Sequence, residues 1–518
     1  MTATRVPVLI VGAGVGGLAT SALLAQHGVR SLLVEKRREF FLYPKARNLS
    51  FRSSEVLRGL GLRDEVRAVA EHVSALVVKP TLNSAAEAPA LDIEAIFAGL
   101  DTLSPEPAAQ YCPQSRLEPI LRDAARRGGG EVRYGTELSS VELDQTGVTA
   151  VVRDAESGKS ETVRADYLVG ADGVHSPLRN RLGISTSGYG ALPIYVVFVY
   201  FRAPWRRFVP ELHDGDGVQV KNDDVDGIFL VAEGDLGMFI TTYFPAAGET
   251  AEQFTPQRCR DVLTKAFGES MDIDIIEVAA WQPYEQVADQ FRCGRAFLVG
   301  DSAHTMPPFK AGGANTAIQS AHNLAWKLAA VLDGHAGPEL LDTYHDERHP
   351  VGRFAARQSL TGPSMALLRP GGDAPQLPAD EECSMFALLI GYRYHSAAVL
   401  ARDADGDGLV DGLRAQPGTR VPHVWVREGV STLDLLGPRF TVLSGDERWC
   451  AAAASVSLAA HRFYSDKWAA VTGLPPDGAL LIRPDDFVGW RSDDLPADPE
   501  GELRQALSAI LGRLPARA

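Results

Sequence analysis

The N-terminal segment places the tightest constraint on how this chain can fold. An apolar run, Val8–Val11, leads into the sequence GAGVGG, and an alanine- and leucine-rich segment follows it. This is a GxGxxG pattern between a strand and a helix. Gly12, Gly14 and Gly17 stand where a tight turn, a close approach to pyrophosphate and helix–strand packing require glycine.

A carboxylate ends the next apolar run. Glu35, with Lys36 after it, lies about twenty residues beyond the glycines, where an acidic side chain can hold a ribose hydroxyl. The whole segment therefore predicts a βαβ dinucleotide site. The alternative is a tight βα turn with an exposed glutamate.

Two further segments present an aspartate just past a buried strand. They are "DYLVGADGVHS" at 166–176 and "FLVGDSAHTMPP" at 297–308. In α/β sheets, ligands bind at the carboxyl ends of the strands, so Asp172 and Asp301 are candidate ligand contacts. Either segment alone could be an ordinary turn. Together with the glycines, they form a constellation of three sites.

Composition excludes several classes of partner. With 518 residues the chain needs two or three domains. Acidic residues outnumber basic ones, 66 to 51, for a net charge of −15, which disfavours nucleic acid as a partner.

The five cysteines are far apart in the sequence, which suits a reducing cytosol. Residues 6–25 are uncharged, but glycines and a proline interrupt them, so we expect no membrane span and a cytoplasmic protein.

Periodicity outlines the remaining elements. Helical spacing predicts helices over 55–69 and 117–127, and a strongly amphipathic helix over 315–332. Residues 194–280 alternate as in an antiparallel sheet with one face on a ligand or core. An Asp-, Gly- and Pro-rich linker over 402–420 precedes a small α/β module, with an alanine-rich helix over 451–461 and a hairpin over 478–490.

The three motifs, in this order, resemble those of the group A flavoprotein aromatic hydroxylases, the family of para-hydroxybenzoate hydroxylase and phenol hydroxylase. The similarity covers most of the chain before the linker. The tail, with "PHVWV", "STLDLLG" and "ALLIRPDDFVGWRS", resembles the thioredoxin-like C-terminal domain of the polyketide hydroxylase branch, which includes the aklavinone hydroxylases.

The resemblance assigns roles to individual residues. In the family the Asp-Gly stretch contacts both FAD and NADPH, which implies Asp172, and the Gly-Asp pair holds the ribityl chain of the flavin, which implies Gly300 and Asp301. The helix that follows begins at the flavin, and its positive end would stabilise negative charge on the reduced ring. Its implied cofactor contacts are Pro308, Gly313, Ala314 and Asn315.

Further contacts follow from weaker matches. "KARNLSFRSSEV" resembles the segment in which relatives carry an arginine beside the flavin, here Arg47. Arg47 and Pro308 are thus the implied catalytic positions. "YCPQSRLEPIL" places Gln114, and with it Arg116, against the cofactor, and Leu138 lies on a strand that passes the adenine in relatives. From residue type alone, both arginines would be surface residues.

One departure and two false motifs stand out. Phe309-Lys310-Ala311 replaces the Thr-Gly-Gly of many relatives, which leaves open whether Lys310 tunes the flavin or contacts substrate. The acidic stretch 403–408 imitates a calcium loop, but Arg414 stands at its twelfth position. His345 and His349 lack the HExxH order. We therefore expect no metal site.

We thus expect an α/β fold. A Rossmann-type FAD domain, 1–185 with 285–400, would be interleaved with a mixed β-sheet substrate domain, 186–284, and followed by a thioredoxin-like domain, 415–518. The lack of a second GxGxxG is consistent with transient binding of the nicotinamide nucleotide.

The resemblance implies a cytoplasmic FAD-dependent monooxygenase that consumes NADPH (or NADH) and O₂. It would hydroxylate an aromatic polyketide-type substrate through a flavin C4a-hydroperoxide, in secondary metabolism such as antibiotic biosynthesis, as a monomer or homodimer. Two alternatives stay open. They are Baeyer–Villiger oxygen insertion by the same fold and a non-catalytic flavin-binding sensor.

Overall fold

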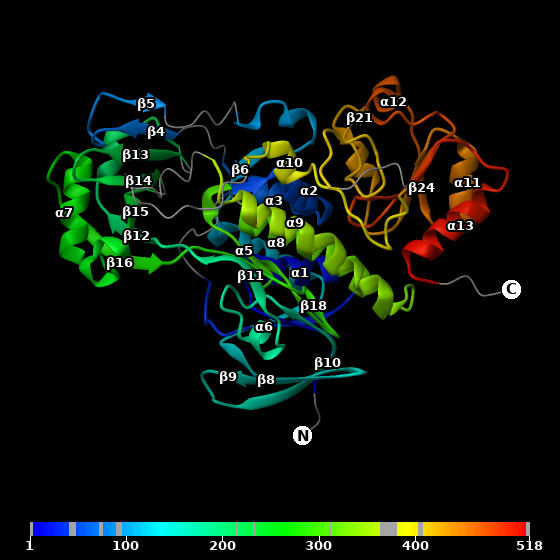
Figure 1. The fold of residues 1–518 in the computed structure, drawn as a ribbon, viewed down its shortest axis with the longest axis horizontal. Coiled ribbons are helices and arrows are strands. Elements are labelled where there is room, and N and C mark those ends of the chain that lie inside the picture. Colours follow the sequence, from blue (N-terminus) through cyan, green and yellow to red (C-terminus); the bar gives the residue numbers. More distant parts are fainter. Residues whose placement is uncertain are drawn as a thin grey trace.

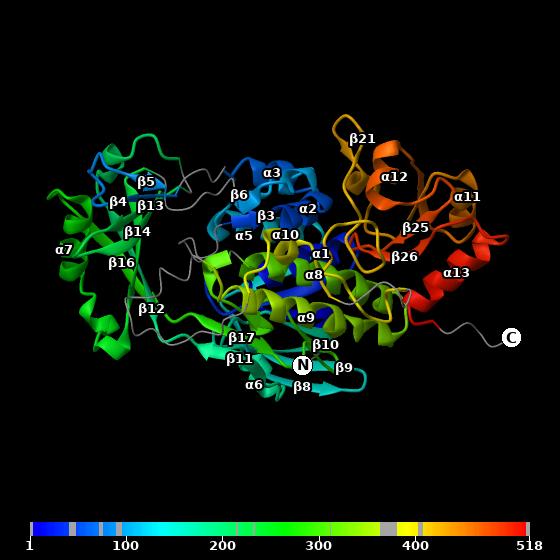
Figure 2. The ribbon, with the colours of Figure 1, turned by 45° about the horizontal axis from the view of Figure 1, so that its top comes forward.

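The computed structural model describes residues 4–40, 48–71, 76–89, 96–213, 216–231, 234–310, 312–362, 381–401 and 408–513. The chain forms three parts in a row (Figure 1). A central body contains α1, α8 and β10, a β-rich part with α7 lies on one side of it, and a C-terminal module with α11, α12 and α13 lies on the other. The turned view in Figure 2 shows the same order.

The central sheet is built from the buried runs that predicted it. Its strands lie in the order β18-β19-β10-β1-β2-β7, and the β8–β9 hairpin continues from β10. Strand β1 pairs in parallel with both β2 and β10. The pairs β10–β19 and β2–β7 are parallel as well. The bounds are β1 Thr4–Val11, β2 Ser31–Glu35, β7 Glu131–Tyr134, β8 Thr136–Asp144, β9 Gly147–Asp154, β10 Ser160–Gly170, β18 Arg292–Cys293 and β19 Ala296–Leu298.

Strand β1 is apolar throughout its second half because both faces of the sheet are covered. Val8 and Ile10 pack in the cluster that includes residues of the helices α1 (Val15–Gln26), α5 (Gln114–Arg127) and α8 (Gly312–Leu332). Leu9 and Val11 pack in a second cluster with residues of β8 and β9. A strand buried on both faces gives a continuous hydrophobic run rather than an alternating one.

Two of the predicted helices differ from expectation. Residues 55–69 form two helices, α2 (Phe51–Gly59) and α3 (Arg63–Arg67), because the Gly-Leu-Gly step at 59–61 ends the first one. The helix predicted over 315–332 exists as α8, but it is not amphipathic. It is buried on all sides from Asn315 to Ala329, so its polar residues face other protein groups instead of water.

The second sheet has the antiparallel character predicted for 194–280. Its order is β16-β12-β15-β14-β13-β4-β5, and only the β4–β13 pair is parallel. One face packs on a helix that the strand pattern did not predict, α7 (Pro256–Phe267). The strands are β4 Leu76–Lys79, β5 Ala88–Pro89, β12 Tyr195–Arg202, β13 Gly217–Lys221, β14 Asp226–Val231, β15 Leu236–Tyr243 and β16 Asp274–Trp281.

Smaller elements connect the two sheets. They are the pair β3 (Asn48–Ser50) and β6 (Ala109–Tyr111), the three-stranded sheet β11 (Thr186–Ala191), β17 (Tyr284–Ala288) and β20 (His304–Thr305), and the helices α6 (Pro177–Arg181), α9 (Thr343–Gln358) and α10 (Met385–Leu389). Residues 390–401, after α10, contain no helix.

The C-terminal module follows the order β23-α11-β24-α12-β25-β26-α13, with the small hairpin β21 (Trp425–Arg427) and β22 (Val430–Ser431) before it. Its sheet order is β24-β23-β25-β26, with β23 and β24 parallel. The thioredoxin-like interpretation of the module, made from its sequence segments, stays a prediction. The bounds are β23 Thr441–Ser444, α11 Glu447–Ser455, β24 Ala459–Arg462, α12 Asp466–Thr472, β25 Ala479–Ile482, β26 Val488–Ser492 and α13 Pro499–Ile510.

One helix of this module was predicted too long. The alanine-rich helix ends at Ser455, and residues 459–462 form the parallel strand β24. Pairing with β23 at the sheet edge overrides the local helical preference of the alanines. The predicted hairpin over 478–490 is present as β25 and β26.

A fully buried charge cluster joins the C-terminal module to the central body. Both oxygens of Glu347 in α9 accept hydrogen bonds from Arg483, at 2.5 and 2.8 Å, and Oε2 also accepts one from Lys327 of α8 at 2.7 Å. These three side chains are 0% exposed. Burial alone would raise the pKa of Glu347, but the charges of Arg483 and Lys327 outweigh it and lower the pKa. Glu347 is therefore ionised, as are the two basic side chains that contact it.

Two buried histidines are neutral in the same region. Burial, with the nearby charges of Arg348 and Arg52 respectively, lowers the pKa of His304 and of His322 to about 3. In the unfolded chain a histidine has its ordinary pKa of about 6.5. Between these values the unfolded state binds protons that the folded state does not, so stability falls as the pH falls.

We expect the melting temperature to drop as the pH is lowered from about 6.5 towards 4. The slope should reach about 1.4 kcal/mol of unfolding free energy per pH unit for each histidine. His322→Gln should flatten the curve, because glutamine can still accept a hydrogen bond from Arg52 but does not titrate. Calorimetry at several pH values measures this, with the exposed His335→Gln as control. Equal slopes in both variants would contradict the assignment.

Candidate cofactor site

The predicted motifs meet at one edge of the central sheet. Strands β1, β2, β10 and β19 are parallel, so their carboxyl ends lie together. The glycine loop follows β1, Lys36 follows β2, Asp172 follows β10 and Gly300 follows β19. Segments from three distant parts of the sequence are thus brought to the position where α/β sheets bind ligands.

The three glycines of the motif have different physical roles. Gly12 has a φ of +107°, and a Cβ there would lie 2.2 Å from the carbonyl oxygen of Ala171. A Cβ on Gly17 would lie 2.0 Å from the oxygen of Gly12. The protein itself therefore requires both glycines.

Gly14 is different because its surroundings are open. The nearest atom to a Cβ at this position is Oε1 of Glu118, at 4.0 Å. Neither φ nor packing within the protein demands glycine here. The open space lies at the start of α1, where a pyrophosphate approaches the backbone N–H groups in dinucleotide sites. The residues present therefore fit a dinucleotide.

Glu35 is tied to the glycine loop. Its Oε2 accepts a hydrogen bond from the backbone N–H of Ala13 at 2.8 Å, and its Oε1 accepts one from the backbone N–H of Arg37 at 2.9 Å. The carboxylate at the end of β2 thus holds the loop in place. The neighbouring Lys36 is exposed.

The Gly300-Asp301 turn lies against both helices of the site. Gly300 has a φ of +69°, and a Cβ on Gly16 of α1 would lie 3.5 Å from its Cα. Asp301 is exposed, and its Oδ1 lies 3.9 Å from where a Cβ on Gly313 would be. The carboxylate is therefore beside the first turn of α8.

Asn315 in that first turn has a structural partner. Its Oδ1 accepts hydrogen bonds from the backbone N–H and the hydroxyl of Ser50, at 2.9 and 3.2 Å, and its Nδ2 donates to the carbonyl of Asn48 at 3.0 Å. Asn315 thus clamps β3 to the start of α8. Arg47, directly before β3, lies outside the described residues.

Asp172 also has structural partners. Its Oδ1 accepts a hydrogen bond from Ser176 at 2.5 Å and its Oδ2 accepts one from the backbone N–H of Leu178 at 2.9 Å. Both oxygens thus cap the start of α6. Gly173, which follows, has a φ of +89° and open surroundings, so its backbone is accessible at the sheet edge.

The start of α5 contributes a residue that sequence reasoning missed. Gln114 donates a hydrogen bond to Oε1 of Glu118 at 2.5 Å, and Glu118 is buried beside Gly14. Glu118 lies four residues after Gln114 on the same helix face, and this spacing could have predicted that the two side chains meet. Arg116 instead contacts Glu71 and the carbonyl of Val69. Leu138 is buried beneath the edge in the cluster with Val11 and Val34.

Lys310, which departs from the family pattern, contacts two protein side chains. Pro308, exposed, and Lys310 lie in the short turn before α8. The ammonium group of Lys310 donates to Glu382 at 2.8 Å and to Thr361 at 2.9 Å. Its charge is therefore compensated by protein groups.

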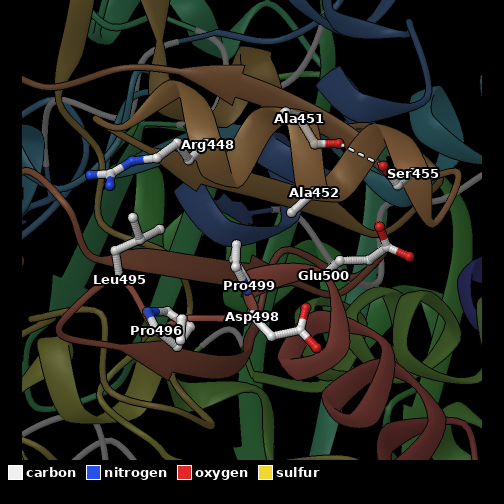
Figure 3. Close-up of a pocket in the computed structure, with 10 residues that line it drawn as sticks. Arg448, Ala451, Ala452, Ser455, Leu495, Pro496, Asp498, Pro499 and Glu500 are labelled. Carbon is white, nitrogen blue, oxygen red and sulfur yellow. Dashed lines mark hydrogen bonds between the residues drawn. The ribbon is translucent and has the colours of Figure 1, made fainter.

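No group of three metal-binding side chains gathers among the described residues, and the acidic stretch 403–407 lies outside them. Within the same ranges, no helix has the length and apolar character needed to cross a bilayer. Figure 3 shows a hollow of about 620 Å³ between α11 and the residues that lead into α13, and no candidate cofactor residue lines it.

The parallel sheet and its glycine loop define a Rossmann-type dinucleotide-binding protein that also has a second sheet and a C-terminal module. Comparison with known proteins agrees. Residues 5–359 match the FAD binding domain family, and residues 414–514 match the family of aromatic-ring hydroxylase C-terminal domains.

Relatives cover the full length. Tetracenomycin A2 monooxygenase-dioxygenase from Streptomyces glaucescens is 38% identical over 99% of this chain and 98% of its own. The 4-methyl-5-nitrocatechol 5-monooxygenase from Burkholderia is 39% identical over 98% of both chains. A ternary complex of aklavinone-11 hydroxylase with FAD and aklavinone superposes with a TM-score of 0.88 at 33% identity, covering 99% of this chain and 100% of that one.

The chain therefore belongs to the family of FAD-dependent aromatic-ring hydroxylases. It is a flavin monooxygenase with FAD as its cofactor, and the expected α/β fold is confirmed. The family supports the enzyme interpretation over the flavin-binding sensor.

We expect Gly14→Val to abolish FAD binding while the chain stays folded. The protein leaves room for the side chain, but a bound pyrophosphate would occupy the same space. FAD content by absorbance and secondary structure by circular dichroism measure the two effects. Gly437→Val is the control, since a Cβ there meets nothing within 4 Å. One FAD per chain in the Gly14 variant would contradict the site.

We expect Asp301→Ala to weaken FAD binding by about tenfold or more, because a hydrogen bond to a charged group contributes about 1.5–3 kcal/mol. Misplaced flavin should also release more peroxide per NADPH oxidised. Fluorescence titration and peroxide assays measure these effects. Asp333→Ala, at the other end of α8, is the control. Unchanged affinity and coupling would show that Asp301 does not hold the cofactor.

Proposed function

We propose that this enzyme uses NADPH and O₂ to hydroxylate an aromatic substrate of polyketide type, a polycyclic phenol or anthraquinone-like molecule. When bound, FAD supplies the redox and oxygen-transfer chemistry, through the C4a-hydroperoxide that the family resemblance implies. The protein binds and orients the reactants, excludes water and places charge at the flavin.

The observation that carries the substrate class is the aromatic face of the second sheet. On β12 the side chains of Val197, Val199 and Phe201 pack towards α7. Phe198, which alternates with these residues along the strand, points to the other face. Its ring centroid lies 6.2 Å from that of Trp281, with an interplanar angle of 9°, and 6.3 Å from that of Tyr200, with an interplanar angle of 19°.

Aliphatic side chains extend this aromatic face. Leu230 and Met238 are buried there with Tyr200, while Phe198, Ile228 and Ile240 are only partly buried. Figures 1 and 2 show α7 on the outer side of the sheet and the central body on the opposite side. The partly exposed Phe198, Ile228 and Ile240 on this face favour apolar contact with a planar multi-ring molecule.

The relatives support the proposal without deciding it. Their names include a tetracenomycin and aklavinone, but also a nitrocatechol at similar identity. Overall identity therefore does not separate large from small aromatic substrates. The width of the apolar face, which spans β12, β14, β15 and β16, favours the larger ones.

Several residues of this chain would act on the cofactor. The first turn of α8, with Gly313 and Ala314, presents free backbone N–H groups and the positive end of the helix dipole. Such donors stabilise negative charge that develops on a reduced ring. Asp301 would hold the flavin chain beside this turn, and Pro308 would shape the approach to it. We also propose Arg47 as a contact, on the resemblance alone.

Oxygen-isotope labelling tests the proposed reaction. Turnover with heavy-isotope O₂, NADPH and a panel of hydroxylated anthraquinones and 4-methyl-5-nitrocatechol should give a product with one labelled ring hydroxyl, detected by mass spectrometry. NADPH oxidation should be slow without substrate and faster with it. Preference for the nitrocatechol would overturn the substrate class. Label in a new lactone would indicate Baeyer–Villiger insertion, and oxygen from water would refute the monooxygenase.

A further inference from the structure

Arg52 of α2 is a fully buried hub between the central body and the C-terminal module. Its guanidinium donates to Asp486 at 2.9 Å and to the backbone carbonyl of Asp485 at 2.8 Å, both in the turn between β25 and β26. It also pairs with Glu55 of its own helix at 3.0 Å and meets Nδ1 of His322 in α8 at 3.3 Å. One side chain thus links α2, α8 and the module.

The other end of this link is the cofactor edge. Ser50, two residues before Arg52, is the N-cap of α2 and the last residue of β3. Asn315, in the first turn of α8, clamps Ser50 by two hydrogen bonds. The short segment from β3 to Arg52 is therefore held at one end by the cofactor helix and at the other by the C-terminal module.

The residue that contacts Arg52 has an unfavourable backbone conformation. Asp486 has a φ of +68°, in the left-handed region that favours glycine. Aspartate adopts this region more readily than most non-glycine residues. Its carboxylate accepts a hydrogen bond from Arg52, which lies outside the hairpin turn.

We propose that Asp486 is a positioning residue for the flavin site. Through Arg52 it sets where α2 and β3 lie against the start of α8, and so gives the C-terminal module a part in the shape of the cofactor edge. The inference rests on the FAD site of the family and not on the identity of the substrate.

Three variants separate position from stability. Asp486→Gly keeps the turn, since glycine adopts this φ freely, but it removes the carboxylate. In this variant Glu55 remains 3.0 Å from Arg52, and it also remains 3.0 Å from the buried Arg420. Asp486→Asn keeps a hydrogen-bond acceptor and serves as the conservative rescue. Asp434→Asn is the matched control, because Asp434 also joins the module to α2, through Arg58 at 2.6 Å, but Arg58 is not bonded to α8.

The readouts are the dissociation constant of FAD, the visible absorption and circular dichroism of the bound flavin, and the thermal midpoint. None of them requires turnover, so a failure of the proposed hydroxylation does not affect the test. For Asp486→Gly we expect FAD affinity to fall by about tenfold, with an altered flavin spectrum, because the position of β3 against the start of α8 changes. Asp486→Asn should lie closer to the wild type, and Asp434→Asn should match it.

Two results would overturn the proposal. One is an Asp486→Gly protein whose FAD affinity and flavin spectrum equal those of Asp434→Asn, whatever its thermal midpoint. The other is failure of Asp486→Gly to fold, because the contact would then serve stability rather than position. If NADPH and substrate assays are available, the fraction of NADPH oxidised without product should rise in Asp486→Gly alone.

Discussion

The buried contact of Glu347 with Lys327 and Arg483 is the interaction on which the arrangement of the parts depends. It joins α9, α8 and the C-terminal hairpin in a region without water access. The free energy needed to desolvate such charges nearly equals the free energy gained from their attraction. Removing one partner of a buried pair, however, destabilises the protein by about 3–5 kcal/mol. Arg483 also pairs with Asp485 of its own module, and Glu347 with Lys327 of the central body, so the Glu347–Arg483 contact is the one that joins the two parts.

This constraint extends to the cofactor edge through α8. The helix carries Asn315 at its start, His322 in its middle and Lys327 near its end, and each contacts a different element. A helix buried on all sides transmits position along its length, because packed interiors leave little room for local adjustment. The flavin site is thus built on an element that the rest of the molecule holds in place.

Local patterns predicted much of this structure. The glycine motif, the parallel strands and the Asp-containing turns are all present, because each depends on short-range geometry that a few residues determine. Patterns failed where tertiary contacts outweighed local preference. Alanines at 459–460 pair in a strand, α7 went unnoticed among strands, and α8 looked amphipathic because its polar residues face buried partners instead of water.

The sequence by itself determined the family, the cofactor class and the segments that form the edge. Only the tertiary structure showed that Asn315 clamps β3, that Asp172 caps α6, that Lys310 pairs with Glu382, and that Glu118 lies beside Gly14. A sequence motif indicates which backbone conformations and residue types a site requires. The partner of a polar side chain depends on residues distant in the sequence, such as Arg52 and Asp486, which only the folded chain brings within hydrogen-bond distance.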